Sequence, residues 1–168
     1  MERPARAARQ PRGPRRSLLA AVVAAVTLAA CGKITSRSAP TVNTDLAALV
    51  RLVKLPADVG HAEWQTSPMA EHGGDWWVAA VLDVPAAAMP QFLAGPGVAG
   101  TFDTPPGMQA TASFAALKGL PGTRPLAGDR LSVTADLHGI EPCASSPLLH
   151  GHALQLSPTR VFVLLWTT

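Results

Sequence analysis

The sequence predicts an α+β fold: a small, mostly antiparallel sheet of four or five strands with two or three short helices packed on one face. Residues 76–84 form an almost wholly apolar run that is typical of a central strand. Two further apolar runs, 152–157 and 160–166, flank a short turn at Pro158 and predict a C-terminal hairpin. Helical periodicity is confined to short segments between such runs, and this arrangement favours the α+β class.

The first predicted element is a helix at about 44–54, which opens the folded part of the chain. Asp45 suits the first turn, and the preceding Thr44 or Asn43 can cap the helix. Pro56 ends it, because proline lacks the N–H that a continuing helix needs. Apolar residues recur with helical spacing at Leu46, Leu49, Val50 and Val53.

The next segments predict two strands joined by a loop. Residues 60–65 alternate weakly and indicate a strand, while 67–75 carry paired glycines and a proline that indicate a loop. The central strand at 76–84 follows. Because neighbours on a strand point to opposite faces, one of Trp76 and Trp77 should enter the core. The other ring is a candidate ligand platform or partner surface, but we favour a core role for this pair.

The middle of the chain predicts fewer regular elements. An Ala-rich stretch after the central strand predicts a short helix that is kinked at Pro90 or begins near it, and that stops at 95–97. Residues 97–127 are rich in Gly, Pro and Thr, and they predict mostly loop with one helical segment near 111–118. Residues 129–137 alternate and predict another strand.

The N-terminus has the composition of an export signal. Six arginines and one acid occupy the first sixteen residues, and an uncharged run rich in Ala, Val and Leu follows at 18–30. That run is shorter than the about 20 residues that a membrane-spanning helix needs. We therefore expect residues 1–30 to be a signal peptide that is removed.

The end of this segment, Leu28-Ala29-Ala30-Cys31, resembles the lipobox of bacterial lipoproteins. The resemblance implies cleavage before Cys31, a diacylglycerol on its thiol with acyl chains such as palmitate, and often a further chain on the new amine. Two or three chains make membrane attachment stable where one is marginal. An ordinary secretory peptide cut near Ala29 or Ala30 and an uncleaved anchor are the alternatives.

The resemblance also implies an address in the cell envelope. Gly32 is not the aspartate that retains lipoproteins of this class at the inner membrane. The protein is then expected at the outer membrane, facing the periplasm, in a two-membrane bacterium, or on the outer face of the cytoplasmic membrane otherwise. The run Arg15-Arg16-Ser17-Leu18-Leu19 resembles a twin-arginine export signal, so both that route and the general secretory route stay open.

The mature chain is expected to comprise a lipidated tether at 31–43 and a single α+β globular domain at 44–168. The tether is small and polar in composition. After the signal is removed, eight Lys and Arg residues stand against ten Asp and Glu residues, scattered without a cluster. No basic patch can follow a phosphate backbone, so nucleic acid is excluded as a partner. The expected partners are the membrane and another envelope protein.

Three histidines are the weak candidates for a metal or small-molecule site. His150 and His152 would place two imidazoles on one strand face, and His138, Glu141 or Cys143 would be further ligands. Sequence proximity does not by itself supply the three or four ligands that a metal needs, so we predict no metal or other cofactor. With Cys31 carrying lipid, Cys143 has no disulfide partner and should be a buried, inert thiol.

One partial motif resembles an enzyme signature. His61-Ala62-Glu63 ahead of Pro142-Cys143 is similar to the H-x-E and P-C-x-x-C elements of zinc deaminases. Ser146 stands where the second cysteine is required, and the separation is too long for the usual strand–helix unit. An exposed polar strand face explains the H-x-E segment better.

The remaining enzyme motifs are missing from the sequence. It contains no G-x-S-x-G, S-x-x-K, H-E-x-x-H or P-loop pattern, and its acids show no telling spacing. We therefore predict a non-enzymatic envelope lipoprotein that acts through protein contacts, with no assigned catalytic residue. A small-molecule or metal-binding envelope module using the 138–152 region is the alternative, and a hydrolase with a site assembled from distant residues is a further one.

Overall fold

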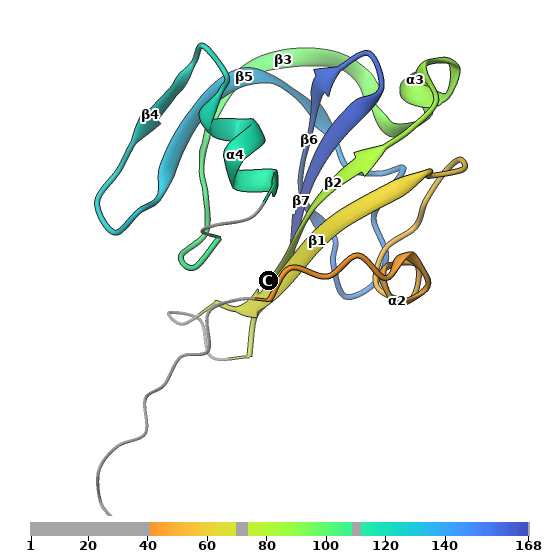
Figure 1. Cartoon of the computed structure of the whole chain (residues 1–168), viewed down its shortest axis with the longest axis horizontal. Coiled ribbons are helices and arrows are strands. Elements are labelled where there is room, and N and C mark those ends of the chain that lie inside the picture. Colours follow the sequence, from red (N-terminus) through yellow and green to blue (C-terminus); the bar gives the residue numbers. More distant parts are fainter. Residues whose placement is uncertain (1–40, 70–73, 109–111, 168) are drawn as a thin grey trace, which may run out of the picture. The chain divides into compact units, whose positions relative to one another are not determined.

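The computed structural model describes residues 41–69, 74–108 and 112–167, and these residues form a seven-stranded sheet. Six strands follow the order β1-β2-β7-β6-β5-β3, and β4 also pairs with β5 (Figure 1). Every pair of neighbouring strands is antiparallel. The strands are β1 His61–Pro68, β2 Trp76–Asp83, β3 Ala94–Asp103, β4 Thr123–Pro125, β5 Leu131–Gly139, β6 His150–Ser157 and β7 Arg160–Trp166.

The predicted antiparallel sheet is confirmed, but the expected size and class are wrong. The sheet is larger than four or five strands, and the described part of the chain is mostly β rather than α+β. The missed strands are β3 and β4, which lie in a segment rich in Gly and Pro that predicted mostly loop. β3 is an edge strand, and an edge tolerates Pro96 because one side of the strand needs no hydrogen-bond donor.

The helices are short and follow the predicted positions. They are α2 Leu46–Leu49, the 3₁₀ turn η2 Ala86–Ala88, α3 Met89–Phe92 and α4 Ala112–Lys118. The helix expected at 44–54 is regular over one turn only. The Asp45 carboxylate caps α2 by accepting a hydrogen bond from the Ala48 N–H (3.1 Å). The helix after the central strand is confirmed, and of the two alternatives it is the start near Pro90 that holds, because the 3₁₀ turn η2 is followed by α3 with Pro90 in its first turn.

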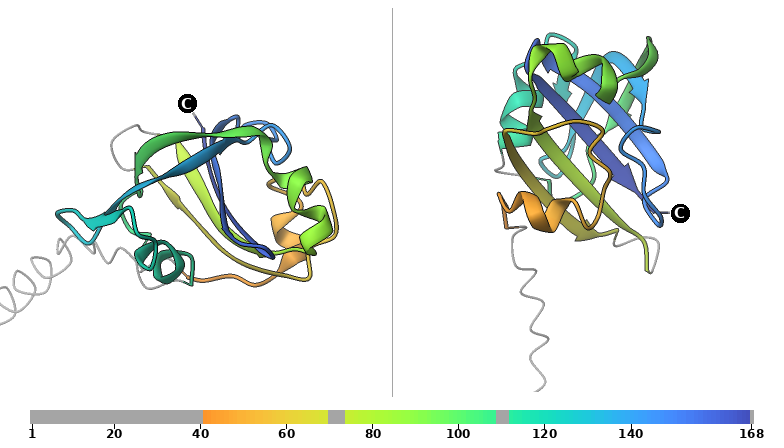
Figure 2. Two further views of the ribbon diagram at one scale, coloured as in Figure 1. Left: turned by 90° about the horizontal axis from the view of Figure 1, so that it is seen from above. Right: turned by 90° about the vertical axis from the view of Figure 1, so that its right-hand side faces the viewer.

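Apolar side chains pack on both faces of β2, because alternate residues of this strand enter different clusters. Val78, Ala80 and Leu82 enter the first core, and Trp77 and the residues alternating with it enter the second. α2 and α3 contribute Leu49, Met89 and Phe92 to the first core, whereas α4 contributes Leu117 to the second. The expectation that the helices share one face is therefore wrong, as Figure 2 shows.

The two tryptophans of β2 divide as predicted. Trp77 is 1% exposed and lies in the second core, while Trp76 is partly buried against the first. The predicted terminal hairpin is also confirmed, since β6 and β7 pair from His150↔Trp166 to Ser157↔Arg160. This hairpin joins β2 to the rest of the sheet and gives the domain its centre.

The sheet opens on the far side of β6. β5 pairs with β6 at one register position among the described residues, His138↔Ala153. Earlier along its length, β5 instead pairs with β4, at Leu131–Val133. β5 and β6 therefore diverge beyond Ala153, and the residues singled out near the C-terminus lie around this divergence.

Candidate functional site

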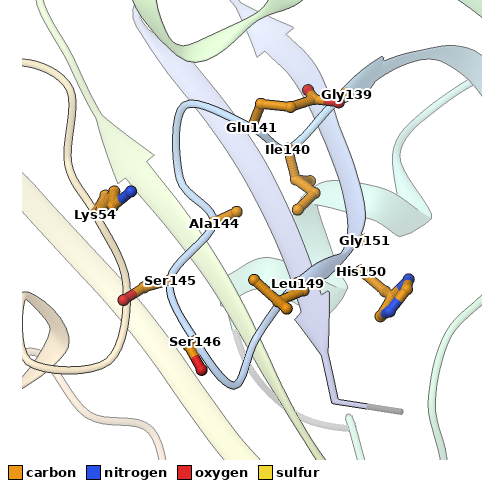
Figure 3. Close-up of a pocket in the computed structure, with 10 residues that line it drawn as sticks. All are labelled: Lys54, Gly139, Ile140, Glu141, Ala144, Ser145, Ser146, Leu149, His150 and Gly151. Atoms are coloured by element: carbon orange, nitrogen blue, oxygen red, sulfur yellow. The ribbon is translucent and has the colours of Figure 1, made fainter.

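Two cavities flank the divergence of β5 and β6. The first, of about 550 Å³, is lined by residues of the connection between the two strands and by Lys54 (Figure 3). The second, of about 570 Å³, lies between the ends of β4 and β5 and the tip of the β6–β7 hairpin, with residues 120–122, 134–136 and 154–158 in its wall. His138 lines the second cavity, and His150 lines the first.

The first cavity gathers polar side chains of several kinds. An ammonium group, a carboxylate, an imidazole and two hydroxyls line it, from Lys54, Glu141, His150, Ser145 and Ser146. In Figure 3 the Glu141 side chain extends toward Gly139, whereas Lys54 and Ser145 lie at the opposite wall. Charges of both signs around one recess suit a small polar molecule that itself carries an anionic and a cationic or hydroxyl group.

Backbone hydrogen bonds hold this connection in place. The Lys54 N–H donates to the Cys143 carbonyl (3.1 Å), and the Cys143 N–H donates to the Ile140 carbonyl (2.8 Å). Ser145 and Leu148 exchange two backbone hydrogen bonds, and the Leu148 side chain is completely buried in the first core. Backbone hydrogen bonds and the buried Leu148 side chain thus fix the cavity wall to the domain.

The cavity does not assemble a nucleophile in the described part of the chain. Serine catalysis requires a base within hydrogen-bond reach of the hydroxyl. Neither Ser145 nor Ser146 receives such a side-chain contact among the residues described, and Lys54 and Glu141 form no ion pair with each other there. These side chains form a polar recess with charges of both signs.

The three candidate histidines have separate surroundings. The His138 Nδ1 lies 3.1 Å from the Gly95 carbonyl oxygen on β3. His152 packs in the second core's margin, with its ring centroid 5.8 Å from that of Phe102 and 5.4 Å from that of Trp166. His150 is exposed beside the first cavity. Across the described residues, no group of three or more His, Cys, Asp or Glu side chains is placed to hold a metal.

The contacts of His152 predict a pH-dependent contribution to stability. Burial lowers the pKa of His152 from its ordinary value of 6.5, so the unfolded chain binds a proton more readily than the folded one. Stability should be undiminished above pH 6.5, fall as the pH drops from 6.5 toward the folded pKa, and level off below it. Urea unfolding of His152→Leu should lose this slope, and the exposed control His150→Gln should keep it. An unchanged slope in His152→Leu would assign it to another group.

Cys143 is a free thiol that is 1% exposed in the first core, as predicted. Burial raises its pKa to about 12, so the thiol stays protonated at neutral pH. A protonated, enclosed thiol is a poor nucleophile and a poor metal ligand. Cys31, and with it the lipobox-like segment, lies outside the described residues.

The H-x-E segment lies on an exposed strand face, which confirms the simpler interpretation. His61 is exposed and Glu63 half-buried, with Ala62 buried between them on the opposite face. His61 Nε2 is 3.7 Å from Glu63 Oε1.

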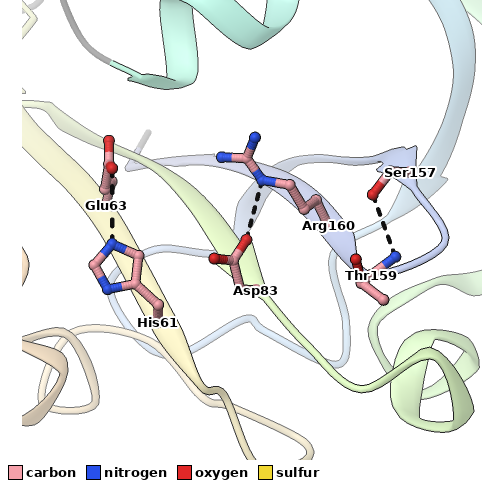
Figure 4. A network of polar contacts seen from close by, with 6 residues as sticks. All are labelled: His61, Glu63, Asp83, Ser157, Thr159 and Arg160. Atoms are coloured by element: carbon pink, nitrogen blue, oxygen red, sulfur yellow. Dashed lines mark hydrogen bonds and ion pairs between the residues drawn. The ribbon is translucent and has the colours of Figure 1, made fainter.

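Two strands away, Arg160 Nε donates to Asp83 Oδ1 at 3.0 Å (Figure 4). Both side chains of this ion pair are more than a third exposed, so it contributes at most about 1 kcal/mol.

A second polar feature, inside the second core, gave no signal in the sequence. Gln65 is 1% exposed, and neither its amide nitrogen nor its amide oxygen has a partner among the described residues. The indole N–H of Trp77 is likewise unpartnered there, and the two side chains share a face because Ser67 pairs with Trp77. Such groups are rare in protein interiors and cost about 1–3 kcal/mol each.

Comparisons with protein-family models, with curated proteins and with solved structures found no match to this chain. Among the described residues, no helix has both the length and the apolar character needed to span a bilayer.

Proposed function

We propose that this chain is a membrane-anchored lipoprotein of the bacterial cell envelope, non-enzymatic and acting through contacts with other envelope proteins. The observation that carries the proposal is the closeness in sequence of the lipobox-like Cys31 to Asn43, which is paired with β1 in the described part of the chain. Asn43 and Trp64 exchange two backbone hydrogen bonds, of 2.8 and 2.9 Å, only twelve positions after Cys31. A lipidated Cys31 would therefore hold the folded domain next to the membrane.

The start of the domain is fastened to the sheet by side chains as well as backbone. The Trp64 indole N–H donates to the Asp45 carbonyl at 3.1 Å, and Trp64 is largely buried in the first core. The Asn43 side chain accepts from the Asp45 N–H at 2.8 Å. A force on the lipid anchor would thus be transmitted to β1 through these hydrogen bonds.

Replacing Cys31 by serine tests the proposal, since serine cannot receive the diacylglycerol. Cys31→Ser should abolish metabolic labelling with a palmitate analogue and release the protein from the membrane fraction. Intact mass spectrometry of the wild-type protein should give the mass of residues 31–168 plus two or three acyl chains. Cys143→Ala is the matched control, because it removes the other cysteine and should keep both label and anchor. A wild-type protein that is membrane-bound yet uncleaved and unlabelled would refute lipidation.

A second candidate function is the binding of a small polar molecule, favoured by the first cavity. Its Lys54, Glu141 and His150 side chains offer a cation, an anion and a proton donor or acceptor within one recess. Native mass spectrometry of the wild-type protein extracted from membranes tests this function, because a bound molecule would add a mass that denaturation removes. A loss of mass on treatment with EDTA would instead indicate a metal. If neither mass change is observed, protein contacts remain the function to pursue.

A further inference from the structure

The charges of the mature chain are divided unevenly between its first segment, 31–54, and the remainder of the chain. From Cys31 to Lys54 the sequence carries four basic residues and a single acid, Asp45. From Leu55 onward it carries four basic residues and nine acids. The basic residues of the first part are Lys33, Arg37, Arg51 and Lys54, and those of the second are Lys118, Arg124, Arg130 and Arg160. The end nearest the expected anchor is therefore cationic, and the rest of the domain is anionic.

The segment that carries Arg51 and Lys54 is also amphipathic. Leu49 and Val53 are buried in the first core and fix the segment to the domain. Val50 is 51% exposed, and Arg51 and Lys54, which follow it in the sequence, are exposed as well. A short surface segment with apolar and basic side chains exposed together has the composition of an interfacial membrane contact.

A second exposed valine, Val42, precedes this segment in the sequence. Val42 is 38% exposed, one residue before the Asn43 pairing with β1. Val42, Val50, Arg51 and Lys54 are named here the anchor-side surface. The Asp45 carboxylate is engaged as the cap of α2, accepting from the Ala48 N–H. Asp58 lines a separate recess with Gly60 and Asp83. Glu141 lines the first cavity together with Lys54, but its carboxylate lies over Gly139, and no ion pair joins these two side chains among the described residues.

We propose that the anchor-side surface docks on an anionic phospholipid bilayer, the same one that holds the lipid of Cys31. The inference rests on the proposed lipid anchor and adds an orientation to it. Ten peptide units separate Cys31 from Thr41, so even a fully extended chain keeps Thr41 within about 36 Å of the anchor. The valines enter the headgroup region, while Arg51 and Lys54 face the lipid phosphates.

This orientation has a consequence for the rest of the domain. Its excess of acids is repelled by an anionic bilayer, so the same field that attracts the anchor-side surface turns the remaining surface away. In Figure 1, β3 lies at the top of the domain and α2 at its lower right. Docking therefore presents β3 and its exposed Val98 to the space away from the membrane, where a partner protein would approach.

The test uses the mature lipidated protein in vesicles and a fluorophore placed by cysteine labelling. Val50→Cys puts the label on the anchor-side surface. Val98→Cys puts a control label on β3, where Val98 is 67% exposed. Cys143 is buried and Cys31 is acylated, so neither competes for the label. Brominated lipids quench a fluorophore in the bilayer. In vesicles of phosphatidylcholine with phosphatidylglycerol, we expect strong quenching at position 50 and little at position 98.

A charge variant and a change of lipid complete the test. Arg51→Gln with Lys54→Gln should lower the docked-to-undocked ratio about thirtyfold, since each basic residue at an anionic surface contributes about fivefold. Vesicles of phosphatidylcholine alone should weaken quenching similarly. Equal quenching at positions 50 and 98, in protein that still floats with the vesicles, would overturn the docking while leaving the anchor intact. Protein that fails to float with vesicles and lacks acyl mass would instead refute the anchor itself.

Discussion

Phe162→Ala is expected to remove about 3–5 kcal/mol from the free energy of unfolding, a large share of the 5–15 kcal/mol typical of a domain. Phe162 is completely buried at the centre of the second core. It pairs in register with Val81 on β2 and Leu154 on β6, and its ring stacks on that of Phe102 with centroids 6.1 Å apart. Truncation would leave a cavity where the central sheet meets β3.

Urea unfolding followed by tryptophan fluorescence measures this loss. Phe162→Leu is the matched control, because it keeps most of the volume and should cost less than about 1.5 kcal/mol. Val98→Ala removes an apolar side chain of the exposed surface and should change stability by less than about 0.5 kcal/mol. A loss in Phe162→Ala no larger than in Val98→Ala would show that the second core is not the main source of stability.

The second core also shows what local sequence patterns can predict. β2, β5 and the β6–β7 hairpin were predicted because each segment contains an apolar run or an alternation of apolar and polar residues that indicates a buried strand. The start of α2 was predicted too early, with Asn43 or Thr44 as the cap and Asp45 in the first turn, whereas Asp45 itself caps the helix. These elements depend on interactions between residues close in sequence, or on an apolar run long enough to be a strand in any context.

β3 was missed because its structure comes from a distant partner. Its residues are mostly exposed, and Gly and Pro within it indicate a loop. It becomes a strand by pairing with β5 from Val98↔Leu137 to Asp103↔Ser132. Side chains reinforce the pairing, as the Thr101 and Thr134 hydroxyls are 2.9 Å apart. The sequence of residues 94–103 alone therefore does not predict the pairing with β5.

The candidate site shows the same limit. The 138–152 region was the binding site only of the alternative hypothesis, and both cavities adjoin it. Lys54 was missed because it is far from this region in the sequence and is joined to it by a backbone hydrogen bond to the Cys143 carbonyl. The histidines, close in sequence, have separate surroundings: His152 lies among aromatic rings, and His150 lies at the first cavity.

Gly151→Ala is expected to destabilise the domain severely, because two independent costs coincide at this position. Gly151 has φ of +153°, a conformation that residues with a side chain rarely adopt, and such strain costs about 1–3 kcal/mol. A Cβ would also overlap the Leu164 carbonyl oxygen of β7, with overpacking of about 1–3 kcal/mol. The neighbouring strand cannot yield easily, since Leu165 is buried in the first core and paired with Gly151.

Chemical denaturation of Gly151→Ala beside Gly119→Ala separates this effect from the general response to alanine. A Cβ at Gly119 would meet its nearest atom, the Ala116 carbonyl oxygen, at 3.6 Å, an ordinary contact, so that variant should stay near wild-type stability. Because Gly151 also lines the first cavity, a partly folded Gly151→Ala protein should lose any ligand of that cavity together with the β6–β7 pairing. Equal stability of the two variants would mean that β6 can shift past Leu164.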